Sequence, residues 1–212
     1  MIEKMLSNLD WLGHDCFRLR AAGQVVYFDP FQLSGALPPA DLILITHEHF
    51  DHCSPDDIKK IRQDATVIIT EPLSAAKLSG TPNVKAMQPG QKITRGPFTI
   101  ETVRAYNTNK KFHPRANNWL GFIVTVEGVR IYHAGDTDYI PEMADYDADI
   151  ALLPVSGTYV MTADEAAQAA IDINPKVAVP MHFGAIVGEQ SDAQRFAGKL
   201  AGKITVHLPQ KK

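Results

Sequence analysis

Short runs of apolar residues, separated by turn-forming residues, occupy the first part of the chain. Apolar-rich runs at Leu9–Leu12, Cys16–Arg20 and Val25–Phe28 predict strands, and Gly23 marks a turn between the last two. The run Asp41–Thr46 is almost continuously apolar, which is typical of a strand covered on both faces. The pattern therefore predicts a sheet with a buried strand near residue 45.

Helix signals follow this buried strand. Ser54 as N-cap and a proline at the first helical position predict a helix over Pro55–Arg62. A strand over Thr66–Thr70 and a short helix over Pro72–Leu78 come next. The chain thus begins to alternate between strands and helices.

The remaining pattern is β-rich in the middle and alternating at the end. Thr162 and Glu165 form a capping box that opens a helix, and Glu127-Gly128 makes a tight turn between two strands. The predicted elements are the strands Phe98–Tyr106, Trp119–Glu127, Val129–His133, Ile150–Leu153, Lys176–Pro180 and Ile204–Leu208, and the helices Ala163–Ile171 and Asp192–Leu200. Central strands with helices outside in both halves predict an α/β fold of two packed sheets with helices on the outer faces.

Composition narrows the class of protein. The chain has 212 residues, of which 45% are hydrophobic and 21% charged, so we expect one globular domain over residues 1–212. A formal net charge of −3 argues against a nucleic-acid partner. Two cysteines cannot build a zinc ribbon or a disulfide framework. With neither a signal peptide nor an apolar run of membrane-spanning length, we expect a cytoplasmic protein with no membrane partner.

The segment after the buried strand carries the chemistry. His47, His49, Asp51 and His52 lie within six residues. Two histidines at i and i+2 of an extended chain point the same way, and the turn toward Ser54 lets the next two side chains point elsewhere. One loop could therefore serve two adjacent divalent ions, which clamp a reacting oxygen when they lie about 3.5–4 Å apart.

This His47-x-His49-x-Asp51-His52 motif resembles the signature of the metallo-β-lactamase superfamily. The resemblance implies a four-layered αββα sandwich, with two mixed sheets flanked by helices and a two-metal site at one sheet edge. It also implies three further ligands in the order His, Asp, His. The matching residues are His113 in the loop Asn107–Asn118, and Asp136 and His182, each just after a predicted strand.

Carried over to this chain, the resemblance implies two ligand sets and a bridging carboxylate. Asp136 would bridge the ions, of which the first would be held by His47, His49 and His113 and the second by Asp51, His52 and His182. Zn²⁺ suits these donors best, and Mn²⁺, Fe²⁺ and Ni²⁺ suit them too. A water between two such ions loses its proton near neutral pH and can attack a carbonyl or phosphoryl centre. Asp51 or a metal-bound water is the first candidate to move a proton to the leaving group, and His14 is the second.

The opening segment resembles a compact branch of this superfamily that includes ascorbate-6-phosphate lactonase. The resemblance rests on Trp11-Leu12-Gly13-His14 and Tyr27-Phe28-Asp29-Pro30. It implies that Asp29 orients a ligand histidine through its free N–H. His14 and His133 could support the ligands in the same way or pack as ordinary strand-end and core histidines.

These observations predict a metal-dependent hydrolase acting on a small ester, lactone or phosphoester. Lys111 and Arg115 flank His113 and could bind an anionic group of the substrate, or form a solvated basic loop. Two alternatives stay open: a mononuclear-iron oxygenase of the same fold, and a non-catalytic module that senses a metal or metabolite. His49 stands where flavodiiron relatives carry Glu, which argues against di-iron oxygen chemistry.

Overall fold

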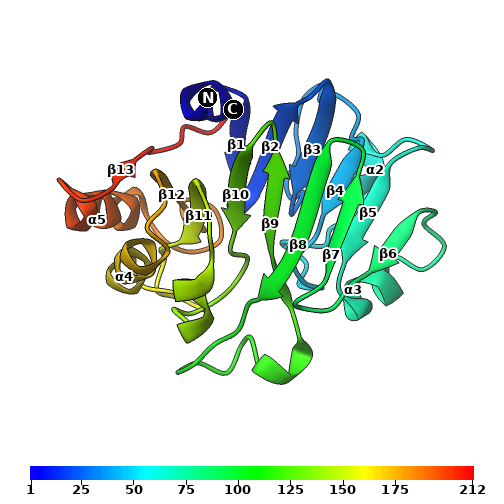
Figure 1. Ribbon diagram of the computed structural model, residues 1–212. Coiled ribbons are helices and arrows are strands. Elements are labelled where there is room, and N and C mark those ends of the chain that lie inside the picture. The colour runs from blue at the N-terminus through cyan, green and yellow to red at the C-terminus, as the bar shows by residue number, and fades with distance from the viewer.

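Two mixed β-sheets pack face to face in the computed structural model, which describes residues 1–212 (Figure 1). The first sheet has six strands in the order β1-β2-β3-β4-β5-β6. Its strands are β1 (Leu9–Gly13), β2 (Cys16–Ala21), β3 (Gln24–Phe28), β4 (Leu42–Leu44), β5 (Val67–Thr70) and β6 (Val84–Ala86). Strands β3 to β6 run parallel, and β1, β2 and β3 are antiparallel neighbours.

The second sheet has seven strands in the order β13-β12-β11-β10-β9-β8-β7. Its strands are β7 (Lys92–Arg95), β8 (Phe98–Arg104), β9 (Leu120–Val126), β10 (Val129–His133), β11 (Ile150–Pro154), β12 (Val177–Met181) and β13 (Thr205–Val206). Strands β10 to β13 are parallel, whereas β7 to β10 form antiparallel pairs. Parallel strands from both sheets thus end near one edge of the molecule.

Helices cover the outer faces of the two sheets (Figure 1). The helices are α1 (Ile2–Ser7), α2 (Pro55–Ile61), α3 (Pro72–Lys77), α4 (Ala163–Ile173) and α5 (Gln190–Leu200), with 3₁₀ turns at Arg115–Asn117 and Pro141–Asp145. Helix α2 packs on the first sheet, while α4 and α5 contact β11 and β12 of the second. This arrangement confirms the predicted αββα sandwich.

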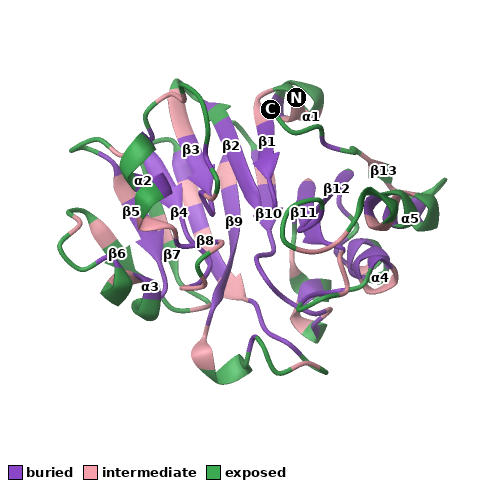
Figure 2. Cartoon of the chain, turned by 180° about the vertical axis from the view of Figure 1, so that it is seen from behind, coloured by how far each residue is buried: buried purple, intermediate pink, exposed green.

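The buried strand β4 shows how the layers are held. Leu42 and Leu44 belong to the 46-residue cluster that fills the space between the sheets and continues beneath α4 and α5. Ile43 points the other way and joins a 12-residue cluster with Ile58 and Ile61 of α2. Because alternate side chains of a strand face opposite sides of the sheet, both faces of β4 must be apolar. Figure 2 shows the buried positions concentrated in the central strands.

Strand β4 is shorter than the predicted Asp41–Thr46. The amide of Ile45 still donates to the carbonyl of Ile69, but the amide of Thr46 donates to Oδ1 of Asp29 at 2.8 Å. This side-chain acceptor draws the chain out of the sheet before His47. The early end of the strand therefore brings the histidine motif to the sheet edge.

Local signals in the sequence account for the caps and the tight turn. Ser54 accepts a hydrogen bond from the amide of Asp57, and Thr162 forms the predicted capping box with Glu165. Glu127 and its following glycine both have positive φ angles, of 48° and 73°, as a two-residue hairpin turn requires. The prediction missed α1, β6 and β7, which are short. Most positions of β6 and β7 are exposed, so they give no apolar alternation.

The two cysteines are free and buried. Burial raises the pKa of Cys16 to about 12 and that of Cys53 to about 11, so both stay protonated thiols at neutral pH. Cys53 directly follows His52, yet as a buried thiol it is a poor metal ligand. No helix has the length and apolar character needed to cross a bilayer.

Candidate metal centre

Segments that follow five strands meet at one edge of the sandwich. The amide of His182 donates to the carbonyl of His14, which joins the two sheets there. Since parallel strands from both sheets end at this edge, their following loops can present polar side chains to one another. The residues brought there are His14 after β1, Asp29 after β3, the motif His47–His52 after β4, Asp136 after β10 and His182 after β12.

The predicted first ligand set is brought together. The ring nitrogens of His47, His49 and His113 lie within 4.8 Å of one another. Their ring centroids are 4.6 to 5.3 Å apart. His113 folds inward from the loop between β8 and β9 and is 1% exposed. A single ion could therefore reach all three rings.

Asp136 lies between the two predicted ligand sets. Its Oδ2 is 3.1 Å from Nε2 of His113 and 3.4 Å from Nε2 of His182. Its Oδ1 is 3.3 Å from Nε2 of His52, and Oδ2 of Asp51 is 3.7 Å from that same nitrogen. One carboxylate thus touches histidines of both sets, which is the arrangement that a bridging ligand needs.

Hydrogen bonds at the far ring nitrogens orient His47 and His52. Nδ1 of His52 lies 2.8 Å from Oδ2 of Asp29, and Nδ1 of His47 lies 3.0 Å from Oγ1 of Thr46. The Thr46 hydroxyl gives its only proton to Asp29 at 2.7 Å, so it must accept the proton of His47 Nδ1. In this network Nδ1 donates on both rings and Nε2 faces the site, as metal-binding histidines require.

His113 and His182 are held in the same way. Nδ1 of His113 lies 3.2 Å from both Oδ1 of Asn107 and the carbonyl of Tyr159, which are acceptors only. Nδ1 of His182 lies 2.8 Å from Oγ of Ser156, whose proton goes to the carbonyl of Thr158. Both rings therefore donate from Nδ1 and present Nε2 to Asp136.

The donor atoms that face the site fit a divalent cation. The Nε2 atoms of His47, His52 and His113 and Oδ1 of Asp136 are buried and have no hydrogen-bond partner. An unpartnered buried polar atom costs about 1–3 kcal/mol, and four such atoms converge here. Nitrogen and carboxylate donors are the ligands of zinc and of related divalent ions. A bound cation would satisfy all four atoms at once.

Burial and neighbouring charges set the protonation of the site. Burial lowers the pKa of His47 and of His49, which keeps both rings neutral at physiological pH. Burial opposes ionisation of Asp136, but the charges of His182 and His52 outweigh it and hold its pKa well below the usual range. Burial also disfavours a charged His52 ring. The negative charges of Asp136 and Asp29 outweigh this effect and raise the pKa of His52. A cation at Nε2 of His52 would therefore replace a proton.

His14 and Asp15 lie next to residues of the second ligand set. Nε2 of His14 lies 3.1 Å from Oδ2 of Asp51, and its ring centroid is 4.3 Å from that of His182. Burial opposes ionisation of Asp51, but the His14 hydrogen bond and the charge of His52 lower its pKa to about 2.

The sequence prediction omitted Asp15, a fully buried carboxylate with one oxygen 3.9 Å from Nδ1 of His52. Burial and the charge of Asp136 raise the pKa of Asp15. Its position directly after His14 was the available signal.

Three other predicted residues lie outside the cluster. His133 stacks on Phe28, with centroids 5.2 Å apart, and its Nε2 contacts the carbonyl of Asp15 at 2.8 Å. It packs in the core and holds the backbone next to His14. Arg115 pairs with Glu142 at 3.0 Å, and Lys111 is exposed. Neither cation lines the pocket at the site, because the loop that turns His113 inward directs these side chains outward.

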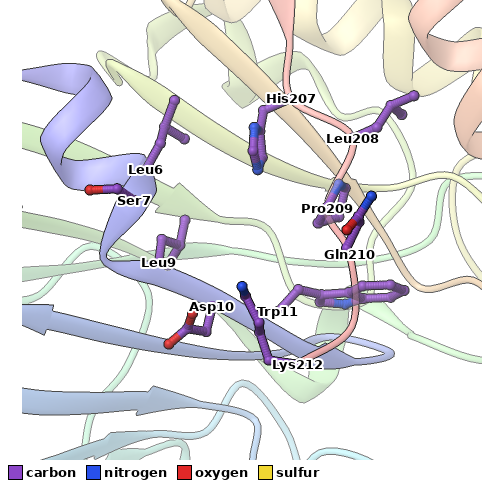
Figure 3. A pocket seen from close by; sticks show the side chains of 10 residues that line it. All are labelled: Leu6, Ser7, Leu9, Asp10, Trp11, His207, Leu208, Pro209, Gln210 and Lys212. Carbon is purple, nitrogen blue, oxygen red and sulfur yellow. The ribbon is translucent and has the colours of Figure 1, made fainter.

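A pocket of about 260 Å³ opens onto the cluster. Its lining residues are His49, Phe50, Asp51, Phe112, His113, Asp136, Tyr159 and Ile186. A second hollow, of about 330 Å³, lies between α1 and the C-terminal segment (Figure 3). It contains His207 but no cluster of candidate ligands, and its Asp10 is paired with Arg18 and Arg20. Candidate metal ligands therefore line the pocket beside Asp136 and not the second hollow.

An αββα sandwich with a buried His/Asp cluster at the sheet edge defines a class of metal-binding proteins, and comparisons with known proteins agree. The family described as "Beta-lactamase superfamily domain" matches residues 8–182. A protein named "UPF0173 metal-dependent hydrolase" from Thermoplasma acidophilum is 34% identical over 212 residues, covering 93% of this chain and 92% of the relative. The chain therefore belongs to the metallo-β-lactamase superfamily and is a metal-dependent hydrolase.

Solved structures show the same fold. A protein from Parabacteroides distasonis, described as a metal-dependent hydrolase, has a TM-score of 0.87 and 35% identity, with 96% of this chain and 93% of that chain covered. Igni18, described as a metallo hydrolase from Ignicoccus hospitalis, has a TM-score of 0.77 at 23% identity, and the match covers 96% of this chain and 94% of Igni18. At that lower identity the likeness concerns the fold alone.

Proposed function

We propose that this protein hydrolyses a small ester, lactone or phosphoester with two divalent metal ions, most simply Zn²⁺. The first ion is assigned to His47, His49 and His113, the second to Asp51, His52 and His182, and Asp136 is assigned to bridge them. The observation that carries this proposal is the position of Asp136, whose oxygens lie 3.1 Å from His113, 3.3 Å from His52 and 3.4 Å from His182. Mn²⁺, Fe²⁺ and Ni²⁺ suit the same donors.

When bound, such ions acidify water and polarise the carbonyl or phosphoryl oxygen of the substrate. The chain supplies the proton path. Asp51 lines the pocket and is ionised at neutral pH, because its pKa is lowered to about 2. It can accept a proton from the attacking water and give it to the leaving oxygen. His14, whose pKa is lowered by burial, stays neutral and hydrogen-bonds Asp51 from behind, which holds the carboxylate at the pocket.

The pocket supports a small-molecule substrate. Its volume of about 260 Å³ admits a small organic molecule or one end of a larger one. The chain carries a formal net charge of −3, which does not favour a nucleic-acid backbone. A small soluble ester, lactone or phosphoester therefore suits the site better than a polymer does.

The test is metal-dependent turnover. Metal-free protein is loaded separately with Zn²⁺, Mn²⁺, Fe²⁺ or Ni²⁺ and assayed with p-nitrophenyl acetate, γ-butyrolactone and bis-p-nitrophenyl phosphate. We expect hydrolysis with at least one metal, and a loss of about 100-fold or more in Asp136→Asn and His52→Ala. His207→Ala is the matched control, because this histidine is exposed and lines the other hollow. Hydrolysis that survives both substitutions would contradict the proposed site.

A further inference from the structure

Four large hydrophobic side chains surround the mouth of the pocket at the candidate metal centre. Apart from the candidate ligands, every residue that lines this pocket is aromatic or aliphatic. The four side chains, with their exposed fractions, are Phe50 (65%), Phe112 (53%), Tyr159 (36%) and Ile186 (40%). We call them the apolar rim.

Exposed hydrophobic side chains of this protein are concentrated in the apolar rim. The whole chain exposes eight large hydrophobic side chains, and four of them are in the rim. They come from four different connections, namely β4–α2, β8–β9, β11–α4 and β12–α5. Single exposed apolar residues are ordinary, but a group gathered at a concave site marks a ligand-binding surface.

Contacts fix parts of the rim relative to the candidate ligands. Phe112 and Tyr159 pack edge to face, with ring centroids 4.6 Å apart at 80°. The carbonyl of Tyr159 lies 3.2 Å from Nδ1 of His113 and accepts a hydrogen bond of 2.8 Å from Asn107. Phe50 packs edge to face on Phe31 at 5.9 Å. An apolar group held by the rim would therefore have a defined position beside His113 and Asp136.

No lysine or arginine lines the pocket, and two of the three nearby cations are already paired. Nζ of Lys110 lies 2.6 Å from Oδ1 of Asp138, and Arg115 is paired with Glu142. Lys111 is exposed but does not line the pocket. The carboxylates that line the pocket are Asp51 and Asp136. A phosphate or carboxylate on the outer part of a substrate would meet apolar rings and no cationic partner, so burying it there would be unfavourable.

We propose that the substrate is an uncharged ester or lactone with a short aliphatic chain or an aryl ring, and that this group binds against the apolar rim. The proposal rests on the proposed function, because it assigns the substrate class of the same site. Water adds its oxygen to the acyl carbon, the acyl C–O bond breaks, and the leaving oxygen takes a proton. An ester gives a carboxylic acid and an alcohol, and a lactone gives a single hydroxy acid. Recognition comes from burial of the apolar group, not from pairing with a charge.

A series of esters tests this substrate class. The metal-loaded protein is assayed with p-nitrophenyl acetate, butanoate and hexanoate, and with the p-nitrophenyl monoester of adipic acid. That last ester has the length of the hexanoate but ends in a carboxylate. We expect kcat/KM to rise roughly two- to fourfold per buried methylene until the pocket is filled, and the adipate ester to fall well below the hexanoate. A flat series, or a preference for the adipate ester, would overturn the proposal.

Matched variants locate the effect. Ile186→Ala and Phe112→Ala should reduce the rise in kcat/KM with chain length, because they remove the surface on which the chain is buried. Leu208→Ala is the control, since Leu208 is 39% exposed against 40% for Ile186 and lines the other hollow. All three side chains are exposed, so the fold should tolerate each change. An undiminished rise in both rim variants would contradict the assignment.

A binding measurement separates this proposal from the proposed function. Metal-free protein with a labelled Ile186 methyl group is titrated with benzyl alcohol and with benzoate, which differ mainly in charge. We expect saturable shifts of the Ile186 resonance with benzyl alcohol and weaker ones with benzoate. If no ester, lactone or phosphoester is hydrolysed with any of the metals, the proposed function fails, while this titration still shows whether the apolar rim binds an uncharged aromatic group. If esters are hydrolysed but Ile186 responds equally to both probes, only the rim proposal fails.

Discussion

The carboxylate of Asp29 lies 2.8 Å from Nδ1 of His52, and both side chains are fully buried. The same oxygen accepts the hydroxyl proton of Thr46 at 2.7 Å, and that hydroxyl in turn lies 3.0 Å from Nδ1 of His47. One carboxylate therefore fixes the tautomer of one histidine from each proposed ligand set. Asp29 also accepts the amide of Thr46, which ends the buried strand where the histidine motif begins.

Asp29→Asn should weaken metal binding at both proposed sites. An amide keeps the shape but replaces one acceptor oxygen with a donor. Either the Thr46 amide loses its acceptor, or the Thr46 hydroxyl and the His52 ring lose theirs together. Loss of such an orienting partner typically lowers metal affinity about 10- to 100-fold. Competition with a chromophoric chelator measures this affinity.

Asp41→Asn is the control for Asp29→Asn. Asp41 also accepts a backbone amide, that of Val25 at 2.8 Å, but it lies at the start of the strand and away from the histidines. We expect the Asp41→Asn protein to bind metal with the affinity of the wild type. Equal affinity in the Asp29 variant would show that this carboxylate does not support the ligands.

Ser156→Ala should act on the second proposed metal alone. Its hydroxyl accepts from Nδ1 of His182 at 2.8 Å and has no hydrogen bond to the rings of the first set. Removing it leaves the N–H of a buried imidazole without a partner, at a cost of about 1–3 kcal/mol. Stepwise metal titration followed by calorimetry should show one weakened step and one unchanged step. Weakening of both steps, or of neither, would contradict the separate assignment of His182.

Gly135→Ala should destabilise the fold through a clash at the site. Gly135 has φ of +63°, and an added Cβ would lie 2.9 Å from the carbonyl of Leu120 and from Cβ of Thr46. Gly23 has φ of +76° with nothing within 4 Å, so Gly23→Ala shares the backbone strain without the clash. We expect Gly135→Ala to lower the free energy of unfolding by about 1–3 kcal/mol more than Gly23→Ala does. Urea unfolding measures both, and equal losses would show that Thr46 and Leu120 move aside freely.

The pH dependence of stability follows from the buried histidines. Burial lowers the pKa of His133 below the ordinary value of 6.5, so the unfolded chain binds more protons as the pH falls below that value. The stability from keeping this ring neutral is complete above 6.5 and is lost as the pH falls toward the folded pKa. Burial lowers the pKa of His47 in the same direction. His52 acts oppositely, because its raised pKa adds stability that is lost as the pH rises through the folded value.

His133→Gln isolates one contribution to this pH dependence. Glutamine can still donate to the carbonyl of Asp15 but does not titrate. Between about pH 7.5 and about pH 5.5, metal-free His133→Gln should lose less unfolding free energy than the wild type. Parallel urea unfolding curves at the two pH values measure the difference. An equal loss in both proteins would show that His133 is not held neutral.

The features predictable from sequence are those encoded locally or by periodicity. The continuous apolar run around Ile43 predicted a strand covered on both faces, and the packing of that residue under α2 confirms it. The capping box at Thr162 likewise depends on residues three apart. The order of the histidine and aspartate motifs indicated the family, which the comparisons show.

The remaining features depend on contacts between distant segments. Asp15 gives no periodic signal, and its place near His52 arises only when the two sheets pack. The pairing of Arg115 with Glu142 is equally nonlocal, so the sequence could not show that this cation is already engaged. The apolar rim joins four connections that are separate in the chain. Short exposed strands such as β7 were missed because their residues show no apolar alternation. Hydrogen bonds to the neighbouring strand β8 hold β7 in the sheet, and the sequence does not show this pairing.

The most direct test of the metal centre is anomalous diffraction at the zinc edge from crystals of zinc-loaded protein. Two peaks are expected about 3.5–4 Å apart, with the Asp136 carboxylate between them. One peak should lie about 2.0–2.1 Å from ring nitrogens of His47, His49 and His113, and the other should be bound by Asp51, His52 and His182. A single peak, or peaks away from Asp136, would contradict the two-metal assignment.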